Sequence, residues 1–223
     1  MRNLLSLPFA VPFLLLAAAP AAGQTRLGVT GGLNLASVDV STGELFVPDF
    51  ESVARMSIGV SVTTPISENL GFQLAGSYSQ KGGRWDVSLP DVRADITLKA
   101  DYFEVAGLGT LRLPLSGDRI SAHLLGGPAL ALEVSCEAIA MATFEGTNVN
   151  TTQSCDEDGA LERSKFDLSV AGGGGIEFEL SDSMGLSFDA IYTLGLLDID
   201  KAERDSLKHR VLTLRAGLVY SIG

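Results

Sequence analysis

The sequence FDLSVAGGGGIEFELSDSMGLSFDAIYTL, residues 166–194, decides the fold class. Apolar residues occupy alternate positions in both of its halves, beginning with Phe166, Leu168 and Val170. This period of two places the apolar residues on one face of a β-strand and the polar or small residues on the other. Residues 181–183 form a tight turn, so the stretch predicts an antiparallel hairpin. Each arm can cross a bilayer as a tilted strand, which takes about 9–11 residues.

The same alternation recurs along the chain, which predicts eight strands in total. The other six are residues 26–36, 56–63, 70–79, 101–113, 120–134 and 210–222. Long polar segments follow the first, third, fifth and seventh strands, and short turns follow the second, fourth and sixth. The long segments are residues 37–55, 81–97, 137–165 and 196–207. Pro128 cannot donate to a ladder, which predicts a bulge or register break in the fifth strand.

This arrangement predicts an all-β fold: an eight-stranded antiparallel up-and-down transmembrane β-barrel. All short turns would lie at one end of the barrel and all long loops at the other. An even strand number, this asymmetry and a dyad repeat of hydrophobicity are typical of outer-membrane barrels. Closure leaves no strand edge unpaired in lipid. The alternative is a soluble barrel of the lipocalin or streptavidin type, with its apolar face inward. The small residues and few charges on the polar face, such as Glu104 and Arg215, favour a narrow polar lumen instead.

The beginning of the chain predicts a secretory signal peptide over residues 1–23. Arg2 supplies a positive charge, residues 4–19 are mostly apolar, and Ala21-Ala22-Gly23 offers a cleavage site. An N-terminal anchor helix is the alternative, and prolines at 8, 12 and 20 weaken it. Residues 24–223 are then one barrel domain, which we expect as a monomer in the outer membrane of a Gram-negative type of cell, surrounded by lipid.

The formal net charge is −11, and cleavage would remove Arg2 and make the protein more negative. Because no Lys/Arg cluster offsets this charge, nucleic acid is excluded as an expected partner. The long loops carry much of the acidic excess, including Asp156-Glu157-Asp158. This triplet lacks the twelve-residue calcium-loop pattern. We expect the loops to contact lipopolysaccharide, through a bridging cation, or another surface ligand, since function on such scaffolds lies in loops.

The two cysteines, Cys136 and Cys155, both lie in one polar region. In an oxidising compartment they predict a disulfide. Closing a loop of this size is worth about 3 kcal/mol in the chain-entropy model. A free thiol is the alternative. Their spacing matches no zinc pattern, so neither a metal nor a cofactor is predicted.

The charged residues on the polar face predict a network inside the lumen. They are Glu104, Arg112, His123, Glu177, Asp189 and Arg215. All but Glu104 fall near the short-turn end, where Arg112 is expected to meet His123, and Asp189 to lie between Glu177 and Arg215. The network satisfies buried polar groups and closes the lumen. A gated path for ions or small molecules is the alternative.

Several short segments resemble the PorT-like outer-membrane β-barrel family, which is related in architecture to the OmpA and OmpX barrels. They are Gly28-Val29-Thr30-Gly31-Gly32-Leu33-Asn34, Asp101-Tyr102-Phe103-Glu104-Val105, Gly126-Gly127-Pro128 and the hairpin of residues 166–196. The resemblance covers essentially the whole chain after the signal peptide. It implies the fold and the location, and for most members no defined activity.

No pattern in the chain predicts an enzyme. The four glycines at 172–175 lie inside a strand and no Lys-Ser/Thr pair follows, so they are not a phosphate loop. They are expected to permit barrel curvature. A lipid-modifying hydrolase is the alternative, with His209 near Asp205 and Ser206, but no spacing fixes a triad. We therefore predict a non-enzymatic barrel with structural or interaction roles.

Overall fold

Nine β-strands make up the part of the chain that the structure describes. The computed structural model describes residues 24–41, 51–89, 92–116, 119–144, 147–155, 165–196 and 206–222. The strands are β1 (Thr25–Ser41), β2 (Glu51–Pro65), β3 (Leu70–Leu89), β4 (Val92–Ser116), β5 (Ile120–Phe144), β6 (Thr147–Ser154), β7 (Phe166–Ser181), β8 (Met184–Gly195) and β9 (Ser206–Ile222).

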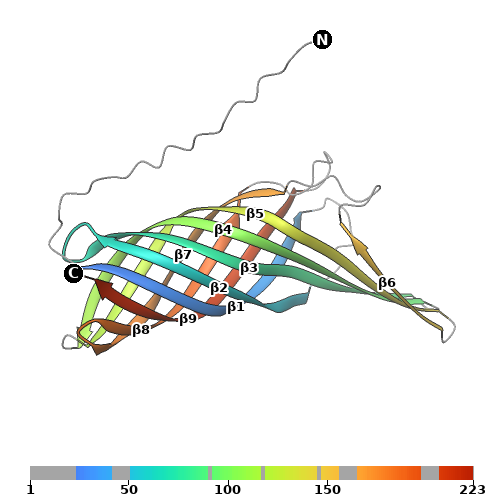
Figure 1. Ribbon diagram of the computed structural model, residues 1–223. Coiled ribbons are helices and arrows are strands. Elements are labelled where there is room, and N and C mark those ends of the chain that lie inside the picture. The colour runs from blue at the N-terminus through green and yellow to red at the C-terminus, as the bar shows by residue number, and fades with distance from the viewer. Residues whose placement is uncertain are drawn as a thin grey trace, which may run out of the picture.

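Eight of these strands close into a barrel (Figure 1). Their order is β4-β3-β2-β1-β9-β8-β7-β5, and pairing of β4 with β5 completes the circle. All pairings are antiparallel, and β1 pairs with β9 from Thr25↔Ile222 to Ser41↔Ser206. The predicted eight-stranded up-and-down barrel is therefore confirmed. The remaining strand, β6, pairs with β5 and extends the sheet outside the barrel.

The outer wall of the barrel is apolar and its interior is mostly polar. In β7 and β8, exposed Phe166 and Phe188 are each followed by a buried aspartate, Asp167 and Asp189. The other barrel strands expose large apolar residues in the same way, for example Val60 in β2. A soluble barrel with an apolar interior would show the opposite arrangement. Among the residues described, no helix is long and apolar enough to span a membrane.

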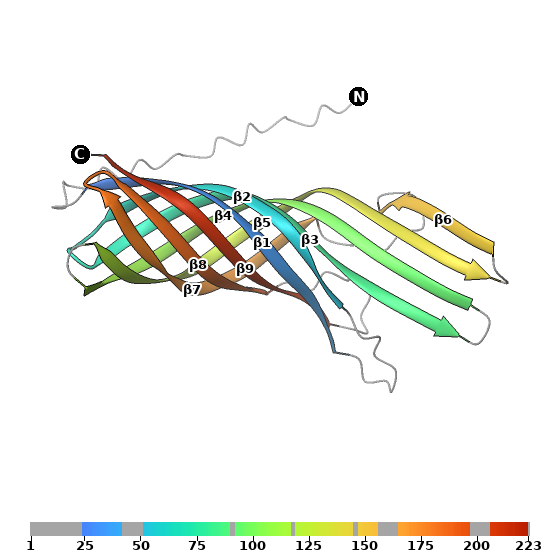
Figure 2. The same ribbon diagram turned by 90° about the horizontal axis from the view of Figure 1, so that it is seen from below.

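The strands β3, β4 and β5 run far beyond the barrel, and β6 pairs with the projecting part of β5 (Figure 2). This corrects two of the predicted loops. Residues 81–97 belong mostly to the ends of β3 and β4, and residues 137–154 mostly to β5 and β6. We call this projecting part of β3, β4, β5 and β6 the outer sheet. The loop predictions were wrong because they relied on apolar alternation, which arises where one face of a strand contacts lipid. A sheet that has left the bilayer keeps its hydrogen bonds without that pattern.

Some predicted features lie outside the described residues. They are the signal peptide, residues 42–50, Asp156-Glu157-Asp158 and Asp205. Ser206 and His209 lie in β9, but their side chains are not described.

Pro128 interrupts the ladder between β4 and β5 without changing its register. Pairing stops at Ala106↔Ala129 and resumes at Gly109↔Gly126. The missing amide hydrogen of proline explains the interruption. Register shifts occur elsewhere in this ladder, one of them next to Tyr102.

The predicted disulfide joins Cys136 in β5 to Cys155, which directly follows β6. The Cα atoms are 5.4 Å apart. The amide of Cys155 donates to the carbonyl of Cys136 over 3.1 Å. Both cysteines are buried in a cluster with Ala100, Tyr102 and Ala131. The bond therefore closes the open end of the β5–β6 hairpin, opposite its turn, where β5 leaves the barrel.

Replacing both cysteines with serine should loosen β6 and leave the barrel folded. In the chain-entropy model, opening a link across a sequence separation of 19 costs about 3 kcal/mol. Because β6 pairs with β5 and with no other described strand, this loss falls on the hairpin. Hydrogen exchange should show faster exchange of β6 amides, while heat-modifiable gel mobility stays unchanged. Loss of the mobility shift would contradict this assignment.

Candidate functional site

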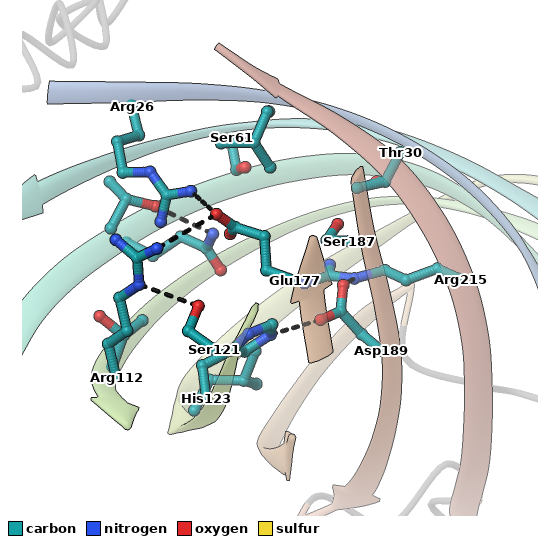
Figure 3. A pocket seen from close by; sticks show the side chains of 16 residues that line it. Arg26, Thr30, Ser61, Arg112, Ser121, His123, Glu177, Ser187, Asp189 and Arg215 are labelled. Atoms are coloured by element: carbon teal, nitrogen blue, oxygen red, sulfur yellow. Dashed lines mark hydrogen bonds and ion pairs between the residues drawn. The ribbon is translucent and has the colours of Figure 1, made fainter. Parts of the chain in front are cut away.

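Charged side chains from six strands meet in the lumen near the short-turn end (Figure 3). The inward positions of the alternation place them there, because successive side chains of a strand point to opposite faces. They are Arg26 of β1, Arg112 of β4, His123 of β5, Glu177 and Glu179 of β7, Asp189 of β8 and Arg215 of β9.

Asp189 is the centre of the first cluster. Its Oδ1 lies 2.5 Å from His123 Nε2, and its Oδ2 accepts from Arg215 Nε over 2.9 Å. The Asp189 side chain is 3% exposed. Both carboxylate oxygens are thus engaged, so one buried anion links β5, β8 and β9.

Glu177 is the centre of the second cluster, which lies nearer to the short turns. It pairs with Arg26, and Arg112 Nη2 lies 3.7 Å from its Oε1. Arg112 also donates to Glu179 Oε1 over 2.6 Å and to Ser121 Oγ over 3.0 Å. Two arginines and two glutamates therefore balance one another at this end of the lumen.

These pairs differ from the predicted ones. Arg112 and His123 are register partners, as neighbouring strands predict, but their side chains bind other groups. Asp189 binds Arg215 as expected, whereas Glu177 pairs with arginines instead of lying beside Asp189. The lumen of an eight-stranded barrel is so narrow that side chains reach strands that are not neighbours. His123 and Asp189, for example, lie on strands separated by β7.

Glu104 lies apart from both clusters, nearer to the outer sheet. Its Oε1 is 2.5 Å from Lys81 Nζ, which also sits 4.7 Å from the centre of the Tyr102 ring. The Tyr102 hydroxyl lies 3.3 Å from Glu133 Oε2. Lys81 and Glu133 are buried, as is Asp167. The lumen thus holds a third set of charged residues, which we call the upper charges: Lys81, Glu104, Glu133 and Asp167.

The predicted lumen network omitted four of its contributors: Arg26, Lys81, Glu179 and Asn34. Lys81 fell in a predicted loop, and the others occupy inward positions that the alternation could have identified. Asn34 is fully buried and donates to Ser79 Oγ over 2.8 Å, while Thr213 donates to Asn34 Oδ1 over 2.8 Å. It therefore joins β1, β3 and β9 through neutral hydrogen bonds.

The glycine run of β7 makes room for the first cluster. A Cβ atom on Gly175 would lie 2.4 Å from Asp189 Oδ1 and 2.9 Å from His123 Nε2. A Cβ atom on Gly173 would lie 2.2 Å from the carbonyl oxygen of Ala190. Gly172, on the outer face, has nothing within 4 Å. The inward glycines are thus required by close packing inside the barrel.

The arrangement suits mutual neutralisation rather than chemistry on a substrate. A cavity of about 70 Å³ lies among the charges, and one of about 250 Å³ lies at the short-turn mouth. The hydroxyl of Ser121 accepts from Arg112, and that of Ser187 donates to the carbonyl of Gly217 over 3.5 Å. Within the described residues, no group of three or more His, Cys, Asp or Glu side chains is placed to hold a metal ion.

Comparison with solved structures finds outer-membrane barrels that are similar to this chain, and OprG has the same fold. OprG from Pseudomonas aeruginosa has 13% identity and a TM-score of 0.52, with 91% of this chain and 98% of that chain covered. Neisserial surface protein A has 10% identity and a TM-score of 0.48, with 89% and 97% covered. Escherichia coli outer membrane protein W has 12% identity and a TM-score of 0.46, with 92% and 100% covered.

No curated protein sequence is similar enough to this chain to count as a match. The model of the outer membrane protein β-barrel domain matches residues 9–220, almost the entire chain. Together with the closed barrel and its apolar outer wall, this match shows that the chain belongs to the outer membrane protein β-barrel family.

Proposed function

We propose that this protein is a non-enzymatic outer-membrane barrel with a closed lumen, which presents its outer sheet and long loops for structural or interaction roles. The observation that carries the proposal is the pairing of charges inside the barrel. Asp189 and Glu177 are both buried and both engaged by cations from other strands. Such a network stabilises the wall against opening and leaves no side chain of the two clusters poised for catalysis.

A cleaved signal peptide at residues 1–23 delivers the chain. The motifs in β1 and β4 support a relation to the PorT-like barrels. The barrel works as a monomer in lipid. Lipopolysaccharide or another surface ligand meets the long loops and the outer sheet, which projects from the barrel (Figure 2).

A small pore is the second candidate function, because cavities follow one another along the lumen. The mouth cavity and the cavity among the charges share Arg26, Arg112 and Glu177. If these groups separated, the two spaces would form one vestibule that leads toward Arg215.

Planar-bilayer recording separates the closed barrel from the pore. The wild-type protein should give no steady channels, and Arg215→Ala should raise the conductance, because it removes a guanidinium from the lumen. Arg84→Ala is the matched control, since Arg84 pairs with Asp95 in the outer sheet. Steady wild-type conductance that Arg215→Ala leaves unchanged would refute the closed lumen.

A further inference from the structure

An apolar layer lines one half of the interior of this mostly polar lumen. It consists of Leu108 on β4, Leu125 on β5, Ala171 on β7 and Ile191 on β8, all buried in one cluster. Leu108 is 2% exposed. The four strands are consecutive in the sheet, so the layer covers one half of the wall. The sequence predicted a narrow polar lumen, and this apolar layer was not part of that prediction.

The layer separates two polar compartments. The cavity of about 70 Å³ reaches Leu125 from the short-turn side, where Arg26 and Glu177 lie. A cavity of about 80 Å³ reaches Leu108 and Ile191 from the side of the upper charges, where Glu104 lies. Each compartment has polar groups that can hold water, whereas the layer between them offers none.

The other half of the lumen at this height is closed by Arg215. Both cavities are lined by Thr30, Ser61 and Arg215, so their walls meet there. Asp189 holds the Arg215 guanidinium through its Nε atom over 2.9 Å. The boundary between the compartments thus has an apolar half and a half that an anchored side chain fills.

Small apolar spaces in proteins stay dry, because a water molecule there would lack the two to four polar partners it needs. Hydrophobic constrictions close channels in this way, by dewetting. An ion at the layer would lose hydration and gain no compensating hydrogen bond. Charge pairs alone form a weaker barrier, since water can solvate each partner when they separate.

We propose that the layer of Leu108, Leu125, Ala171 and Ile191 is a dry septum and the main permeation barrier of the barrel, with Arg215 closing the remaining half. The inference rests on the closed lumen proposed above and names the element that closes it. The charged clusters position the strands around the septum, and the septum itself excludes water and ions.

Adjacent leucines of β5 provide the test. Leu125→Ser places a hydroxyl in the septum, whereas Leu124→Ser makes the same change on the outer wall, where Leu124 is exposed. In planar bilayers, Leu125→Ser should give steady channels, which the wild type and Leu124→Ser should not. Heat-modifiable mobility checks that both variants fold. Ile191→Thr, which keeps a β-branched shape, provides a milder second change in the septum.

Each outcome separates this inference from the proposed function. A silent wild type with silent Leu125→Ser and Ile191→Thr variants, and a conducting Arg215→Ala variant, would overturn the septum and retain the closed lumen. Equal conductance of Leu124→Ser and Leu125→Ser would also overturn the septum. Steady conductance of the wild type itself would overturn both.

Discussion

Replacing Asp189 with asparagine should lower the free energy of unfolding by about 3–5 kcal/mol, the usual cost of breaking a buried ion pair. The carboxylate is 3% exposed and engages both His123 and Arg215. Without its charge, Arg215 remains in the lumen with no compensating anion from Asp189. Guanidinium unfolding in lipid vesicles, followed by gel mobility of the folded form, measures the loss.

Glu179→Gln is the matched control for this experiment. Its side chain is 35% exposed, and its partner Arg112 also lies 3.7 Å from Glu177. Solvent screens such a pair, so the change should cost at most about 1 kcal/mol. Similar losses for both variants would show that burial of Asp189 does not set its contribution.

The second large effect is expected from Gly175→Ala. The added Cβ would lie 2.3 Å from the carbonyl oxygen of Phe188, in addition to its clash with Asp189. Overpacking of this kind costs about 1–3 kcal/mol. The variant should therefore unfold at lower guanidinium concentration than the wild type and show a weakened contact between Asp189 and His123.

Gly172→Ala, three residues earlier in the same strand, is the control. Its Cβ meets nothing within 4 Å. Where the native backbone accepts alanine, this change stabilises the folded protein by about 0.4–1 kcal/mol, because it reduces the conformational entropy of the unfolded chain. Two equally destabilised variants would contradict the view that packing requires glycine at 175 and not at 172.

The barrel itself was predictable because lipid imposes a strict rule on every strand that crosses it. Each outward residue must be apolar, so alternation in β7 and β8 shows directly which face meets the membrane. The rule lapses where strands leave the bilayer. Segments such as residues 81–97 therefore read as loops, although hydrogen bonding continues through them.

The sequence predicted which charged residues lie inside the barrel better than it predicted which of them contact one another. Alternation placed Arg112, His123 and Asp189 inside, but pairing was inferred from neighbouring strands. Across a narrow lumen the contact is set by side-chain length and height, as with Arg26 on β1 and Glu177 on β7. These distances have no counterpart in sequence spacing.

The apolar septum shows a further limit of the alternation rule. Leu108 and Leu125 occupy inward positions, which the pattern identifies as facing the lumen. The rule excludes polar residues from the lipid face but places no restriction on apolar residues inside. Their gathering at one height depends on the stagger of four strands, which becomes visible only in the assembled barrel.

The pairing of β1 with β9 has a consequence for how the barrel is made. Thr25 pairs with Ile222, so this ladder joins residues from nearly opposite ends of the sequence. Most other ladders join consecutive strands and can form as local hairpins. Because pairing of distant residues is slow, we expect this seam to form last. Until β9 arrives, β1 is an open edge able to pair with another chain. From the time it is synthesised until β9 pairs with it, the edge of β1 therefore needs protection from pairing with other chains.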